Sequence, residues 1–222
     1  WIHDFGLSHD PGLELDTGML RDAFQSGFAA IWRHQADDDG FNRLILLAGL
    51  GWRDIVILRA YAQYLRQAGT AYSQPYVEAT LAAHPAVAAR LVRLFHARFC
   101  PDTAEAERAE RLAADINERL ESVASLDEDR ILRRMLAAIL ATVRTNFFRT
   151  NPQGRYRDNL AFKLQPEAIP GVPKPIPAFE IFVSSPRVEG VHLRGGKVAR
   201  GGLRWSERPE DYRTEILGLM KA

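Results

Sequence analysis

Residues 194–205, Arg-Gly-Gly-Lys-Val-Ala-Arg-Gly-Gly-Leu-Arg-Trp, bring two glycine pairs and four cationic side chains together within twelve positions. Glycine has no Cβ, so the backbone at these positions can approach a ligand closely. Guanidinium groups present planar sets of donors that match a carboxylate or a phosphate. The segment therefore predicts a loop that binds a small anion.

The six residues 200–205, Arg-Gly-Gly-Leu-Arg-Trp, resemble a signature of the glutamate dehydrogenases. The neighbouring runs make the resemblance specific; they are Ser-Pro-Arg-Val-Glu-Gly-Val-His-Leu-Arg at 185–194 and Glu-Asp-Tyr-Arg-Thr-Glu-Ile-Leu-Gly-Leu-Met-Lys at 210–221. Further similar runs lie at 39–44, 59–67 and 145–151. The resemblance covers most of the chain and is closest to the very large bacterial NAD-specific glutamate dehydrogenases.

In the resembling enzymes, a Lys-Gly-Gly-(Leu or Ile)-Arg-aromatic segment lines the glutamate pocket, and its lysine contacts a substrate carboxylate. The resemblance therefore implies that Arg200, Gly201, Gly202 and Arg204 bind the substrate. Arg200 takes the position of the lysine and keeps the positive charge, but its guanidinium is a longer, forked group. Arg204 matches the family arginine, which we expect to brace the loop. The alternative is a glycine-containing turn between two strands, with no ligand.

By the same resemblance, the whole enzyme oxidises L-glutamate to 2-oxoglutarate and ammonia and transfers a hydride to NAD. The family's catalytic lysine, its aspartate and its dinucleotide fold follow later in the sequence, so we expect no catalytic and no cofactor-binding residue within this chain. The chain begins at Trp1 without an initiator Met and stops at Lys221-Ala222 inside a predicted helix. We therefore expect a fragment that is inactive alone and belongs to a homo-oligomeric enzyme.

Composition favours a soluble cytoplasmic protein without a membrane segment. Of 222 residues, 46% are hydrophobic, the formal net charge is +1, and no 18-residue apolar run or charged leader is present. Cys100 is the only cysteine and the six histidines are scattered, so we expect neither a disulfide nor a metal site. Neither a P-loop nor a Gly-x-Gly-x-x-Gly fingerprint occurs, so a nucleotide site is not expected within this chain.

The hydrophobic period divides the chain near Arg144. Apolar residues recur at helical spacing before it and alternate after it, at 160–165, 179–184 and 191–193. We expect a helical region at 1–145 and, at 146–222, the truncated N-terminal part of a substrate-binding α/β domain. The fold class expected is therefore α+β or α/β. Helices are predicted at 17–32, 41–47, 52–68, 75–83, 86–99, from a cap at Thr103, at 127–144 and from Ser206.

Charge follows the same division. Residues 1–145 contain 16 basic and 20 acidic residues, a net charge of −4, whereas residues 146–222 contain 13 basic and 8 acidic residues, a net charge of +5. An anion site is therefore expected in the second part. Arg194 and Lys197 lie beside the glycines, but we expect them to be solvated charges on a hairpin.

Two other functional classes compete with the enzyme. The Arg-Gly-Gly repeats could form a nucleic-acid-binding segment, but such segments are long and disordered, whereas these two are embedded among Val, Leu and Trp. We therefore expect no nucleic-acid partner. Residues 1–145 could instead be a helical scaffold for subunit assembly, which is compatible with an enzyme. Calcium binding at Asp37–Asp39 is not expected, because the spacing of an EF-hand loop is missing.

Overall fold

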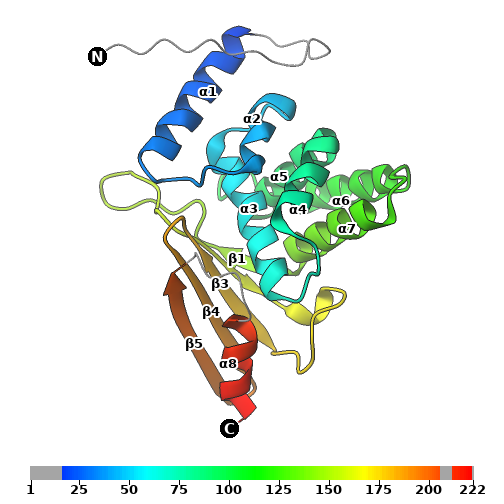
Figure 1. The fold of residues 1–222 in the computed structure, drawn as a ribbon, viewed down its shortest axis with the longest axis vertical. Coiled ribbons are helices and arrows are strands. Elements are labelled where there is room, and N and C mark those ends of the chain that lie inside the picture. The colour runs from blue at the N-terminus through cyan, green and yellow to red at the C-terminus, as the bar shows by residue number, and fades with distance from the viewer. Residues whose placement is uncertain (1–16, 206–211, 222) are drawn as a thin grey trace.

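A computed structural model describes residues 17–205 and 212–221 of the chain. The helices are α1 (Thr17–Trp32), α2 (Leu44–Leu47), α3 (Trp52–Gln67), α4 (Gln74–Ala83), α5 (Pro85–Phe99), α6 (Ala106–Leu120), α7 (Leu126–Ala141) and α8 (Tyr212–Lys221), with short 3-10 helices η1 (Gly40–Arg43) and η2 (Pro166–Ala168). Helices α1 to α7 precede the sheet in the chain, and α8 follows it (Figure 1).

Five strands form one sheet in chain order, and every neighbouring pair is antiparallel. They are β1 (Thr142–Thr145), β2 (Leu160–Leu164), β3 (Phe179–Ser184), β4 (Val188–Gly195) and β5 (Val198–Trp205). Helix α8 contacts β4 and β5, and α3 contacts β2, β3 and α8, so both helices cover the same face of the sheet (Figure 1). This face is called the inner face below. The α+β class expected from the sequence is confirmed.

The sheet begins earlier than the sequence predicted. The last long helix was expected to continue to Arg144, but α7 ends at Ala141 and β1 starts at Thr142, inside the range expected to be helical. Thr142 and Val143 are β-branched, which favours extended backbone, and Arg144 pairs with Lys163 of β2. Pairing of β1 with β2 therefore ends the helix at Ala141, although the apolar repeat of the helix continues to Val143.

Two further helix starts differ from expectation or lie outside the described residues. Thr103 was expected to cap α6, but the N-cap is Glu105, and no side-chain hydrogen bond caps this helix. The start expected at Ser206 falls within 206–211, which are outside the described part of the chain. Helix α6 packs against α5 and α7, so its apolar stripe is used within the chain.

One hydrophobic core joins the helices to the inner face of the sheet. It extends from Phe41 to Leu217 and includes residues of α3, α5, α7, β2 and β3. The Tyr61 ring of α3 stacks on Phe162 of β2 with ring centroids 4.2 Å apart, and Phe95 of α5 meets both rings at their edges. Such aromatic contacts add to the burial of apolar area. Helices α3 and α5 therefore both pack their aromatic side chains against the sheet.

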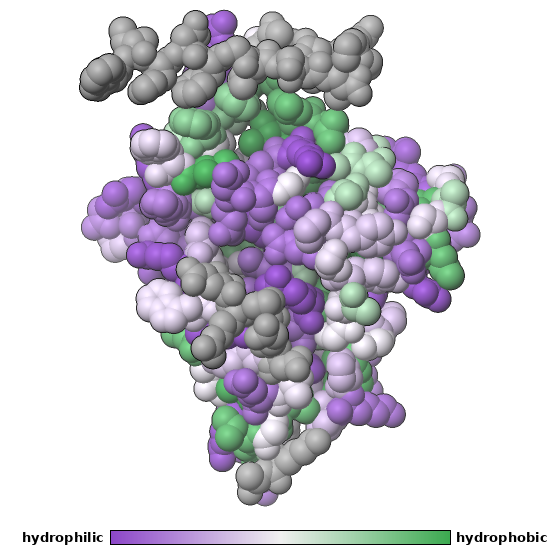
Figure 2. Space-filling model, in the orientation of Figure 1, coloured by the Kyte–Doolittle hydropathy of each residue, from purple (hydrophilic) through white to green (hydrophobic). Residues whose placement is uncertain are grey.

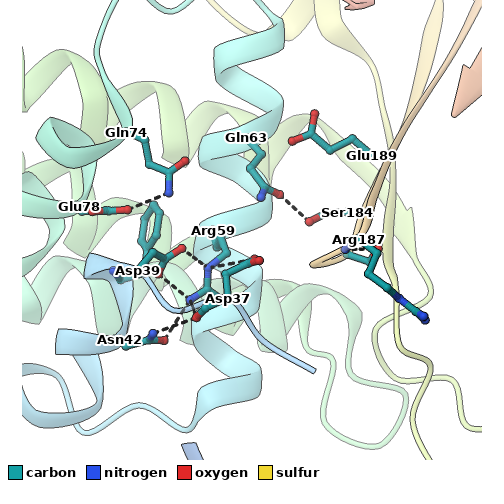
Figure 3. Close-up of polar contacts among 12 residues, drawn as sticks. Asp37, Asp39, Asn42, Arg59, Gln63, Gln74, Glu78, Ser184, Arg187 and Glu189 are labelled. Carbon is teal, nitrogen blue, oxygen red and sulfur yellow. Dashed lines mark hydrogen bonds and ion pairs between the residues drawn. The ribbon is translucent and has the colours of Figure 1, made fainter. Parts of the chain in front are cut away.

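The acidic turn at Asp37–Asp39 is fixed to α3 by an arginine. Arg59 donates from Nε to Asp39 at 2.6 Å and from Nη2 to the same carboxylate at 2.8 Å (Figure 3). Asp39 also accepts from the backbone nitrogen of Phe41 and caps η1. Two parallel hydrogen bonds to one carboxylate are a strong, directional arrangement. The aspartates therefore hold the segment before η1 against α3.

The two polar residues of strand β3, Glu180 and Ser184, point toward the helices. Glu180, Phe182 and Ser184 are buried, whereas the intervening Phe179, Ile181 and Val183 are only partly buried. Hydrogen-bond partners on α3 and α8 explain this orientation. Ser184, for example, donates to Gln63 of α3 at 2.5 Å (Figure 3). A buried polar group with a partner avoids the cost of lost hydration.

Glu180 and Arg213 form an ion pair between β3 and α8 within the protein interior. Their side chains are each only 2% exposed, and both carboxylate oxygens accept from the guanidinium, with Nε 3.1 Å from each of them. The Tyr64 hydroxyl of α3 donates to the same carboxylate at 3.0 Å. Burial, together with the charge of Glu180, raises the pKa of Tyr64 well above its ordinary value, so this hydroxyl stays protonated. One carboxylate thus connects three elements.

Replacement of Glu180 by alanine should lower the free energy of unfolding by about 3–5 kcal/mol, because Arg213 would remain as a buried charge without its partner. Urea denaturation of the 222-residue chain measures this change. Glu107→Ala is the matched control, since its carboxylate is exposed on α6 and should cost less than about 1 kcal/mol. Equal effects of the two substitutions would contradict a stabilising role for the Glu180 pair.

Candidate functional site

The predicted anion-binding segment lies in a β-hairpin formed by β4 and β5. Gly195 pairs with Val198, so the turn consists of Gly196 and Lys197, and Gly196 has the positive φ of 57° that glycine tolerates. Residues 200–205 are paired along β4 as strand β5. The Arg-Gly-Gly-Leu-Arg-Trp motif is therefore a strand, not the loop that its glycines suggested, because the alternation around them matches the register of β4.

Alternation in β5 places the two arginines of the motif on one face. Arg200 pairs with Leu193, and Arg204 pairs with Glu189; both partners are buried on the inner face. Successive side chains of a strand point to opposite faces. Arg200 and Arg204 therefore lie on the inner face, along which α8 runs (Figure 1).

The two glycines of the motif allow β5 to approach its neighbours on both sides. A Cβ at Gly201 would lie 2.8 Å from the carbonyl oxygen of Val191 in the β4 backbone. A Cβ at Gly202 would collide with the hydroxyl of Tyr212, the first residue of α8. Both contacts are closer than real Cβ atoms accept. The glycines therefore set how closely β5 packs against β4 and α8.

Arg204 is held by a buried carboxylate. Its Nη2 donates to Glu189 at 3.2 Å, and its guanidinium carbon lies 5.1 Å from the ring centre of Tyr212. Glu189 also accepts from Arg66 at 3.2 Å and from Gln67 at 3.3 Å, both at the end of α3. Burial raises the pKa of Tyr212, although the charge of Arg204 opposes the shift. Arg204 thus connects β5 to the buried Glu189 of β4.

Arg200 is situated differently, although it lies on the same face. Its side chain is exposed, and its Nη1 donates to the carbonyl oxygen of the adjacent Ala199 at 2.9 Å. Within residues 17–205 and 212–221, no carboxylate forms an ion pair with it. Arg194 and Lys197 are also exposed, near the turn. The guanidinium of Arg200 is consequently available to an anion from outside the described chain.

Sequence reasoning did not identify Glu189 as part of the site, although the run that contains it was singled out. Its position in the strand could have indicated its burial. Glu189 lies two residues before Val191 and four before Leu193, so it shares their buried face. An acidic residue at such a position requires cationic partners. The identity of those partners, on α3 and β5, depends on the tertiary structure.

The described residues contain no ready site for a metal or a dinucleotide. No group of three or more His, Cys, Asp or Glu residues is arranged to hold a metal ion in the part of the chain that is described. All strand pairs there are antiparallel, whereas the dinucleotide fold is built on parallel strands with crossover helices. The described residues therefore do not fit NAD.

None of the described helices is long and apolar enough to cross a membrane.

Comparison with known proteins places these features in a family. A model described as bacterial NAD-glutamate dehydrogenase, catalytic domain, matches residues 115–222, and one described as glutamate dehydrogenase, helical motif 3, matches residues 36–101. NAD-specific glutamate dehydrogenases of Halomonas elongata, Pseudomonas aeruginosa and Mycobacterium tuberculosis are 52%, 50% and 48% identical to the chain.

Each of these alignments covers 100% of the chain but only 14% of the relative, so the chain spans about a seventh of the length of these proteins. The hairpin with its Arg-Gly-Gly-Leu-Arg motif and helix α8 lie within the match to the catalytic domain, and α2 to α5 lie within the match to the helical motif. This chain belongs to the family of bacterial NAD-specific glutamate dehydrogenases.

Proposed function

We propose that this chain supplies a substrate-carboxylate contact to an NAD-dependent glutamate dehydrogenase, which converts L-glutamate and NAD to 2-oxoglutarate, ammonia and NADH. The contrast between two arginines on one face of β5 carries the proposal. Arg204 is paired with buried Glu189, whereas Arg200 is exposed and has no carboxylate partner among the described residues. A fixed strand therefore presents one guanidinium to a ligand.

The chemistry required of Arg200 is binding and orientation. Glutamate and 2-oxoglutarate each carry two carboxylates, and a guanidinium can donate two parallel hydrogen bonds to one of them. Gly201 and Gly202 contribute by fixing the distance of β5 from β4 and α8, as the packing at both glycines indicates. Arg204 contributes through Glu189, which ties the strand to α3.

Hydride and proton transfer are assigned in this proposal to residues outside the chain. The described sheet does not fit a dinucleotide, as argued above, and NAD is named for the relatives as whole enzymes. Under this proposal, the catalytic lysine and aspartate implied by the resemblance belong to the part of the enzyme that this chain does not cover. The substrate site is therefore shared between this chain and the remainder of the enzyme.

Assembly into a homo-oligomer is a second part of the proposal. On α1, Phe24, Phe28 and Trp32 recur every four residues and are exposed, Trp32 to 76%. Hydrophobic residues gather at this end of the molecule, over α1 and α2, in Figure 2. An exposed apolar stripe of this kind is typical of a protein interface. The stripe favours a helical surface used in assembly, and the enzyme itself is proposed to be cytoplasmic.

Removal of the Arg200 guanidinium should weaken catalysis in a full-length glutamate dehydrogenase that carries this chain. Arg200→Ala leaves a substrate carboxylate unpaired, which costs about 2–5 kcal/mol, so kcat/KM for glutamate should fall by roughly 30-fold to several-thousand-fold. Arg200→Lys should recover part of the loss, because it restores the charge. Steady-state kinetics with varied glutamate measures each value.

Lys197→Ala is the matched control for this experiment, since it removes an exposed cation from the same hairpin. It should change kcat/KM by less than about threefold, as expected for a screened surface charge. Wild-type efficiency in Arg200→Ala, with unchanged stability, would remove Arg200 from the substrate site.

The 222-residue chain should produce no NADH when mixed with glutamate and NAD, because the antiparallel sheet supplies no dinucleotide site. Absorbance of the reduced nicotinamide follows the reaction, and a full-length relative under the same conditions serves as the positive control. Turnover by the purified chain would refute the assignment of catalysis to the rest of the enzyme.

Removal of the exposed aromatic side chains of α1 should weaken association of the chain with copies of itself. Phe28→Ser combined with Trp32→Ser should raise the dissociation constant of the oligomer by at least about tenfold, as expected when large aromatic contacts are removed from an interface. Sedimentation velocity over a concentration series measures it, with Gln25→Ser on the same helix as the control. Unchanged association of the double variant would show that α1 is not the interface.

A further inference from the structure

A cavity of about 770 Å³ lies beside the first half of α3, whereas the contacts with Glu189 are made by the last turn of that helix. It is lined by the first half of α3, the segment 151–160 and residues 184–186 at the end of β3. No residue of β5 or α8 lines it. Its volume is within the range of small-molecule sites. The walls contain four arginines, Arg53, Arg59, Arg155 and Arg157, and two aspartates, Asp37 and Asp158.

Arg53 of α3 is a partly buried cation that forms no ion pair with a carboxylate among the described residues. Its guanidinium carbon lies 3.4 Å from the ring centre of Tyr156 and 4.6 Å from that of Phe147. Its Nη2 donates to the carbonyl oxygen of Phe147 at 2.9 Å. The adjacent Asp54 acts on its charge but is bound to His96, 2.8 Å away, rather than to Arg53. Burial lowers the pKa of Arg53, which reflects the loss of water around its charge. Two rings thus hold a desolvated guanidinium at the cavity wall.

Arg59, six residues further along α3, is the second arginine of this helix at the cavity wall. It is 2% exposed, and its Nε and Nη2 are used by Asp39 and Asn42 (Figure 3). Its Nη1 is buried and has no hydrogen-bond acceptor among the described residues. Arg59 is therefore occupied by the turn before η1, which leaves Arg53 as the guanidinium of α3 that can meet an anion in this cavity.

We propose that this cavity binds a small molecule through a carboxylate or phosphate group that pairs with Arg53. The acidic residues of the wall do not remove the positive excess. Asp37 lies 3.7 Å from Arg59, and burial raises its pKa despite that arginine, so its negative charge is disfavoured by its surroundings. Asp158 is exposed on the segment that closes the cavity. An anion therefore meets a net cationic wall.

Binding of two probes to the 222-residue chain tests the proposal. Inorganic phosphate and malonate represent the two anionic groups, and sodium chloride at equal ionic strength reports general salt effects. Isothermal titration calorimetry should give a dissociation constant on the order of 1 mM for at least one probe, and that probe should raise the Tm of the chain above the chloride control. The stronger probe distinguishes a phosphate ligand from a carboxylate ligand.

Arg53→Gln should weaken binding of the stronger probe by at least about tenfold, because it removes a charge-assisted hydrogen bond. Arg149→Gln makes the same charge change at an exposed position near the cavity and should leave the affinity within about twofold. Arg53→Lys keeps the charge but loses the planar fork, and should give an intermediate affinity even if the glutamine variant is unstable. The proposal would be overturned if neither probe bound at 50 mM, which is about fifty times the expected dissociation constant. It would also be overturned if wild type and Arg53→Lys bound the stronger probe with equal affinity.

Discussion

The buried ion pair between Glu180 and Arg213 is the interaction on which the arrangement of the sheet and its helices depends. It joins β3 to α8, and Tyr64 adds α3 to the same carboxylate. Gln67 extends the connection, because it accepts from the backbone nitrogen of Arg213 and donates to Glu189. Charges removed from water are tolerated only where such partners are complete. The position of α8 on the inner face is therefore specified by hydrogen bonds as well as by apolar packing.

This polar network also determines what the hairpin can present. Glu189, at its centre, is shared by Arg66 of α3 and Arg204 of β5. A strand anchored in this way has little freedom to shift along the sheet, so Arg200 projects from a rigid support. Helix α3 connects this region with the cavity around Arg53, since its first half lines the cavity and its last turn binds Glu189. The two sites are thus built on one helix.

Local patterns predicted most of the elements, and distant partners explain the departures. Helices α3 and α5 and strands β2 and β3 follow apolar repeats that can be read directly from the chain. The glycine pairs suggested a loop at 200–205, because their close contacts with β4 and Tyr212 exist only in the folded sheet. The inward orientation of Glu180 depends on Arg213, 33 residues away, and on Tyr64, 116 residues away. The resemblance to a family pointed to Arg200 and Arg204, and the structure shows that Arg204 is paired with Glu189 whereas Arg200 is exposed.

The two-residue turn of the hairpin has a consequence for how this segment can change during evolution. Arg200 and Arg204 share the inner face only because an odd number of residues separates them and because Gly195 pairs with Val198. A single-residue insertion between Val198 and Arg200 that kept the turn would exchange the two faces from that point on. Leu203 and Trp205, now 71% and 72% exposed, would then face α8, and the arginines would face away. Length variation in homologous hairpins should therefore be confined to the turn at Gly196 and Lys197, where it leaves the register of β5 intact.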